Sequence, residues 1–216
     1  MTPYITDGEI VSKFEVAVIN AADQRIAPKL LLFGYHEEAR QADLTLLGQV
    51  RVARDEQQVE YIESRAATAH KQAAKDLARS AFLQLHQVIR LADRNSPDVD
   101  LRHLLQTGEL PTAETLFLDY ASGLLAQIEH YPEVLEFLSR FGVNIERINE
   151  LRVLLQAVRD AGTVQQKERG EAEQATVIYR ELIKQLRLAY STLRGIAKLA
   201  LSDDPQLLEL MGLGKM

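Results

Sequence analysis

A repeat with an offset of 108 residues is the feature that most limits what this chain can fold into. Residues 33–107 align without a gap on residues 141–215, and 21 of the 75 aligned positions are identical. Unrelated helix-rich chains would share about 6 positions from composition alone. A unit this long is a whole supersecondary module and not one turn of a short solenoid. We therefore expect a tandem duplication with pseudo-twofold symmetry, in which residues 1–108 and 109–216 form two helical repeats, packed separately or as one domain.

Each repeat is predicted to contain two short and two long helices. The first short helix covers about 8–25 in one repeat and 112–130 in the other. The second short helix has Pro28 or Pro132 near its first turn and ends at a Phe-Gly pair. The longer helices are expected at 36–54 and 57–94, and at 144–161 and 165–201, where apolar residues recur in steps of three and four. This spacing is typical of the seam of an antiparallel bundle or coiled coil. No run alternates as a strand would, so the predicted fold class is all-α.

The joint between the two longer helices leaves two structures open. In the second repeat, Ala161-Gly162 is a plausible helix stop, which favours a tight helical hairpin. The alternative is one uninterrupted helix, since the first repeat has Arg54 in place of that glycine and the apolar seam continues in phase. Such a helix would place Gln165 and Arg169 on the seam, and burying unpaired polar groups costs on the order of a few kcal/mol each. We therefore expect the hairpin.

Several polar residues are identical in the two repeats although core packing does not require them. They have two possible roles: a structural cluster that joins helix ends, or a pair of equivalent partner-binding tips. We expect the structural role. The pairs are Arg51/Arg159, Gln57/Gln165, Gln58/Gln166 and Glu60/Glu168.

Composition excludes several classes of protein. The chain has no Cys, a net charge of -6 and only 6% aromatic residues. It therefore has no disulfide or thiolate site, and it is a poor candidate for binding nucleic acid. The N-terminal residues do not resemble a signal peptide, and no segment is long and apolar enough for an integral membrane helix. We expect a cytoplasmic protein.

No complete catalytic, cofactor-binding or metal-binding constellation is found. None of the five histidines has Glu three residues earlier, as di-iron bundles require, so solvated or capping roles are expected for His36, His70, His86, His103 and His130. Ser122 lacks the strained turn of a hydrolase nucleophile, and the C-terminal GLGKM lacks the spacing of a phosphate loop. Carboxylate groups such as Glu37/Glu38 and Glu129/Glu133/Glu136 are expected as solvating or pairing residues. We predict a non-enzymatic protein without a cofactor.

A basic strip follows one face of the last predicted helix, formed by Arg180, Lys184, Arg187, Arg194 and Lys198. It could contact an acidic partner, but we expect its cations to pair with acidic residues of a neighbouring helix.

The C-terminal segments QQKERGEAEQATVIYRELIKQLR and GIAKLALSDDPQLLELMGLGK resemble the ending of a diffuse group of uncharacterised bacterial all-helical proteins. The resemblance covers about the last 60 residues, implies a bacterial source and supplies no active site. From the residues themselves we expect a scaffold, adaptor or assembly protein that binds a protein partner or itself. The alternatives are a small-ligand-binding or sensory bundle, with a cavity between the repeats for which the alanine-rich helix at 66–81 leaves room, and a membrane-active helical protein.

Overall fold

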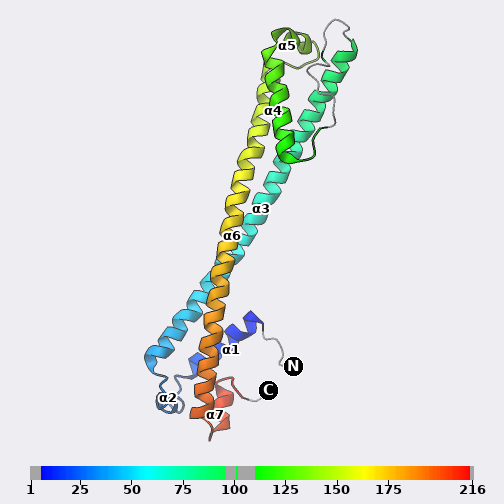
Figure 1. Ribbon diagram of the computed structural model, residues 1–216. Coiled ribbons are helices and arrows are strands. Elements are labelled where there is room, and N and C mark those ends of the chain that lie inside the picture. The colour runs from blue at the N-terminus through cyan, green and yellow to red at the C-terminus, as the bar shows by residue number, and fades with distance from the viewer. Residues whose placement is uncertain (1–5, 96–100, 102–109, 215–216) are drawn as a thin grey trace. The chain divides into compact units, whose positions relative to one another are not determined.

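The computed structural model describes residues 6–95, 101 and 110–214. Within these ranges the chain forms seven α-helices and no strand, which confirms the predicted all-α class (Figure 1). The helices are α1 Asp7–Asn20, α2 Ala27–Leu31, α3 Glu37–Asn95, α4 Glu114–His130, α5 Pro132–Ser139, α6 Ile145–Ala200 and α7 Pro205–Leu210.

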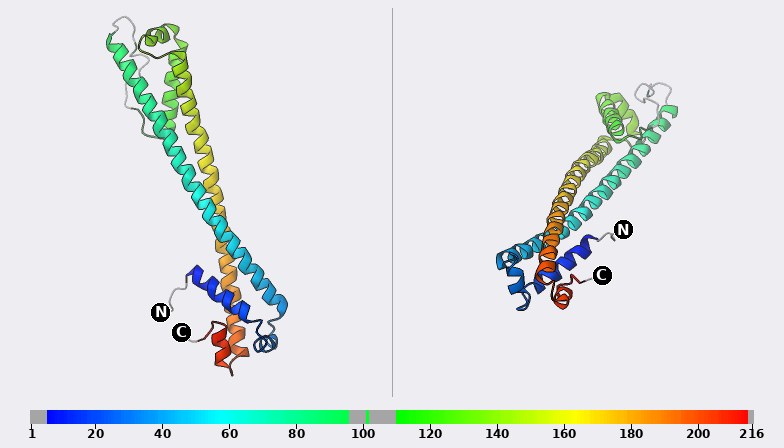
Figure 2. Two further views of the ribbon diagram at one scale, coloured as in Figure 1. Left: turned by 180° about the vertical axis from the view of Figure 1, so that it is seen from behind. Right: turned by 60° about the horizontal axis from the view of Figure 1, so that its bottom comes forward.

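Two compact units divide the chain. Unit 1 combines residues 1–62 with residues 170–216, and unit 2 comprises residues 63–169. In each unit a segment of α3 runs antiparallel to a segment of α6, as the views in Figures 1 and 2 both show. Each unit thus draws residues from both halves of the sequence, while the boundary between the repeats, at residues 108 and 109, remains a prediction about the sequence.

The predicted hairpins are wrong, because α3 and α6 are each continuous through the position of the expected turn. Gly162 lies inside α6, and the side chain of Lys71 lies near its missing Cβ position, with Cε 3.7 Å away. Each half of the sequence therefore contributes one long helix where we expected two. The uninterrupted helix, which we had considered the less favourable alternative, is the observed structure.

The expected cost of burying polar residues on the seam does not arise. In unit 1, Gln57 Nε2 donates a hydrogen bond of 3.2 Å to Thr176 Oγ1. In unit 2, Gln165 Nε2 donates one of the same length to Thr68 Oγ1. Both glutamines are only partly buried, and Arg169 is exposed. A polar seam residue that keeps a partner and some contact with water does not force the helix to end.

The helix ends follow the local sequence signals. Thr6 caps α1, since its hydroxyl accepts from the Glu9 backbone while the Glu9 carboxylate accepts from the Thr6 backbone. Gly34 follows α2 and Gly142 follows α5, with φ of 84° and 81°. This left-handed conformation suits glycine, so both Phe-Gly pairs end their helices as predicted.

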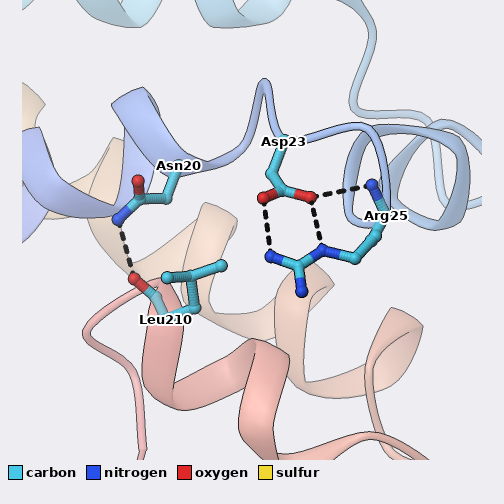
Figure 3. Close-up of polar contacts among 4 residues, drawn as sticks. All are labelled: Asn20, Asp23, Arg25 and Leu210. Atoms are coloured by element: carbon cyan, nitrogen blue, oxygen red, sulfur yellow. Dashed lines mark hydrogen bonds and ion pairs between the residues drawn. The ribbon is translucent and has the colours of Figure 1, made fainter.

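The core of unit 1 brings α1, α2 and α7 against the two long helices. Phe14 of α1 is fully buried and meets Tyr190 of α6 edge to face, with ring centroids 6.1 Å apart. The Asn20 amide donates a 2.7 Å hydrogen bond to the Leu210 carbonyl, so that the end of α1 is tied to α7 (Figure 3). The other buried side chains that share this core include Ile10, Val18, Ile26, Leu30, Leu47, Val50, Leu186, Leu193 and Met211.

The core of unit 2 packs α4 and α5 against the other segments of the long helices. Phe82 of α3 and Phe117 of α4 are both buried, and their rings meet edge to face at 5.8 Å. Arg79 fixes the entry into α4 by donating to the carbonyl oxygens of Leu110 and Pro111, at 3.2 and 2.7 Å. The other large side chains of this core include Ile89, Leu101, Leu125, Ile128, Leu138, Ile148 and Leu151.

Candidate functional site

The histidines are scattered, and one of them is not solvated as we expected. His86 is only 6% exposed, and among the described residues its Nε2 has no hydrogen-bond partner. Burial lowers its pKa, and the nearby Arg90 lowers it further. The expectation of a solvated or capping role is therefore wrong for His86, because it faces the core of unit 2. His36, His70 and His130 are exposed, and His103 lies outside the described residues.

Two of the five surface carboxylates named above, those of Glu37 and Glu129, are paired. Glu37 accepts from Arg40 and Gln41, and these hydrogen bonds lower its pKa to about 2. Glu129 forms an ion pair with Arg152. Glu38, Glu133 and Glu136 are exposed. This arrangement agrees with their predicted solvating and pairing roles.

The alanine-rich part of α3 contributes to a packed core. Ala78 and Ala81 are buried beside Phe82 and Phe117 in unit 2. The lysine of the GLGKM segment lies outside the described residues, and Gly212 of this segment ends α7 with a φ of 69°.

Two of the shared polar pairs join a long helix to another element, and none of the four marks a helix end. Arg51 pairs with Glu15 of α1 at 2.5 Å, and Arg159 donates to Ser122 of α4 at 2.8 Å. Gln57 and Gln165 bind threonines across the seam. All these residues, and also Gln58, Glu60, Gln166 and Glu168, lie within continuous helices. The expected cluster at helix ends and the alternative of partner-binding tips are therefore both wrong.

The basic strip is only partly neutralised. Arg187 pairs with Asp7 of α1 at 2.7 Å, which is the neighbouring-helix pairing that we expected. Lys184 lies 3.7 Å from Glu181 of its own helix. Arg180, Arg194 and Lys198 are exposed, and within the part of the chain that the structure describes no carboxylate pairs with them.

Two exposed leucines accompany these cations on the solvent side of α6. Leu188 is 71% exposed and Leu199 is 63% exposed. Their spacing of 11 residues, about three helical turns, places them on one line along the helix. We define the outer face of α6 as Arg180, Lys184, Leu188, Arg194, Lys198 and Leu199. The exposure of these leucines was not predicted, although both fall outside the apolar seam formed by Leu186, Leu193 and their neighbours.

A second exposed apolar segment lies at the end of α2 and in the turn after it. Leu31, Leu32 and Phe33 are 53%, 82% and 48% exposed, and Leu31 lines a hollow of about 320 Å³. With the offset of 108, the corresponding residues at the end of α5 are Ser139, Arg140 and Phe141. Unit 2 therefore has polar residues at the places of Leu31 and Leu32, and keeps only the phenylalanine. The hollow is lined by Ala21, Ala27, Pro28, Leu31, Tyr35, His36, Glu37 and Arg40.

In comparisons with known proteins, no family model, no curated protein and no solved structure matches the chain. The all-helical architecture implied by the resemblance of the C-terminal segment is observed. Among the described helices, none has an apolar stretch sufficient to cross a lipid bilayer.

Proposed function

We propose that the protein is a non-enzymatic adaptor or scaffold whose outer face of α6, in unit 1, binds an acidic amphipathic helix of a partner protein. The observation that carries this proposal is the combination of two exposed leucines with three cations that have no carboxylate partner among the described residues. A face of this kind offers apolar area for burial and a charge that selects the partner.

The position of the charges supports an acidic partner. The cations lie on one side of the line through Leu188 and Leu199, while the opposite surface of α6 packs into the core through Leu186 and Leu193. The face extends from residue 180 to residue 199, which is about 28 Å along a helix. A helix of similar length could cover both leucines and place its carboxylates beside the cations, as in other helix-to-surface contacts.

The rigidity of α6 also supports a docking role. Ile183, Leu186, Leu193 and Ala197 are buried along this segment. The exposed side chains therefore stand on a helix that is fixed by its opposite face. A preorganised surface loses less conformational entropy on binding than a mobile segment does.

We further propose that the two halves arose by duplication of one module. The hydrogen bonds Gln57–Thr176 and Gln165–Thr68 support this history, because the offset of 108 relates Gln57 to Gln165 and also Thr68 to Thr176. The positive φ values of Gly34 and Gly142 have the same offset.

Capture from a native lysate, with matched variants, tests the proposed function. Leu188→Ser and Arg194→Glu should each reduce recovery of one specific, acidic partner. Leu116→Ser and Arg140→Glu change exposed residues of unit 2 and should leave recovery unchanged. Equal recovery with all four variants would contradict the proposed face, and no specific partner at all would contradict the adaptor function.

A further inference from the structure

A surface hollow of about 340 Å³ lies between α4 and α6 in unit 2. Ser122 of α4 lines one side, and residues of α6 line the other: Arg152, Val153, Leu155, Gln156 and Arg159. Leu155 and the adjacent Val158 are buried in the core, as are Ala121 and Leu124 beside Ser122. Both walls are therefore held in place by packing, so the hollow is a preorganised feature of unit 2.

The two guanidinium groups of this hollow differ in their partners. Arg152 forms an ion pair with Glu129 of α4. Arg159 donates to the Ser122 hydroxyl at 2.8 Å, and across the described ranges it has no carboxylate partner. A hydroxyl satisfies a hydrogen bond without neutralising the positive charge. The hollow therefore keeps one uncompensated cation next to a group that can both accept and donate.

A comparison of α4 in unit 2 with α1 in unit 1 shows which residue corresponds to Ser122. Helices α1 and α4 start at Asp7 and Glu114, an offset of 107 residues. The same offset carries the buried positions 10, 14, 17 and 18 of α1 and the buried C-cap position 21 onto the buried positions 117, 121, 124, 125 and 128 of α4. Ser122 consequently occupies the place of Glu15.

The arginines at the two places also correspond. Arg51 and Arg159 are identical residues separated by the repeat offset of 108. In unit 1, the carboxylate of Glu15 pairs with Arg51 at 2.5 Å. In unit 2, the chain supplies the arginine but replaces the carboxylate with a hydroxyl.

We propose that this hollow is a binding site for the carboxylate of a small organic anion. The ligand carboxylate takes the position that Glu15 fills in unit 1, where it accepts from the Arg159 guanidinium and from the Ser122 hydroxyl. Val153 and Leu155 provide an apolar wall for a short aliphatic chain attached to that carboxylate. The Arg152–Glu129 pair keeps the second guanidinium in place. This site does not depend on the proposed adaptor function.

Titration with sodium propionate, followed by NMR of the arginine Nε–H and backbone amide signals, tests the site. Sodium chloride keeps the ionic strength constant, so that general screening contributes equally at every point. We expect saturable shifts at Arg159 and Ser122, and no saturable shift at Arg51. A uniform response of all exposed arginines would overturn the proposal, as would saturation by inorganic phosphate without saturation by propionate.

Three variants make the test specific. Ser122→Glu should supply the missing carboxylate from the chain and abolish the response to propionate without lowering the melting temperature. Arg159→Gln should abolish it by removing the cation. Glu15→Ser should create a second saturable site at Arg51, raising the number of bound anions from one to two. Persistence of binding in Ser122→Glu, or no new site in Glu15→Ser, would refute the correspondence on which the proposal rests.

Discussion

Replacing Gly162 with alanine is the substitution that best separates a continuous α6 from a hairpin. In a helix interior, glycine is about 1 kcal/mol less favourable than alanine, because it loses more backbone entropy on folding. A Cβ at this position would lie 3.7 Å from Lys71 Cε, an ordinary van der Waals contact. No clash opposes the gain in propensity. We therefore expect Gly162→Ala to raise the free energy of unfolding by about 0.5–1 kcal/mol.

Gly142→Ala is the matched control. Gly142 has a φ of 81°. Apart from its two neighbours in the chain, no described residue has an atom within 4 Å of its missing Cβ position. Its substitution therefore tests backbone strain without steric conflict, and a left-handed backbone costs an L-residue about 1–2 kcal/mol. We expect this variant to be destabilised by that amount in urea denaturation followed by far-UV circular dichroism. If Gly162→Ala were destabilised to the same degree, Gly162 would be a helix-ending glycine and the continuous helix would be refuted.

Three further substitutions probe the cores and their buried polar groups. Phe82→Ala removes the ring that meets Phe117 and should cost about 3–5 kcal/mol in chemical denaturation. His86→Leu should flatten the pH dependence of stability: because burial lowers the pKa of His86, the unfolded chain binds more protons, and wild-type stability is lost as pH falls below about 6.5. Denaturation curves between pH 7 and 5 check this, and an unchanged slope would contradict it. Tyr35→Phe removes the donor 2.8 Å from Asp43 and should cost about 1–3 kcal/mol at neutral pH, measured by thermal unfolding.

Much of the fold could be predicted from short-range patterns. The steps of three and four, the prolines at the starts of α2 and α5 and the Phe-Gly stops depend on neighbouring residues alone, so they are readable in one sequence. The continuity of α3 and α6 is different. It depends on Thr176 and Thr68, which lie 119 and 97 residues from the glutamines that they bind. A single sequence does not show such pairings.

The candidate surfaces were less predictable than the helices. The basic strip is visible in the sequence, but which of its cations are neutralised depends on Asp7, a residue 180 positions away from Arg187. Burial of His86 could have been inferred from its place beside Leu85 and Ile89 on the core side of α3. The contrast between Glu15 and Ser122 required the structure, because the gapless alignment does not extend to α1 and α4.

The central structural claim is that each long helix pairs with the other in both units through equivalent contacts. The chain has no natural cysteine, so pairs of introduced thiols can be cross-linked without background. We would prepare Gln57→Cys with Thr176→Cys, and Thr68→Cys with Gln165→Cys, and treat each protein with a short bis-maleimide. We expect an efficient intramolecular cross-link in both proteins, seen as a cross-linked monomer in mass spectrometry. Failure of both pairs, or cross-links formed only between molecules, would contradict it.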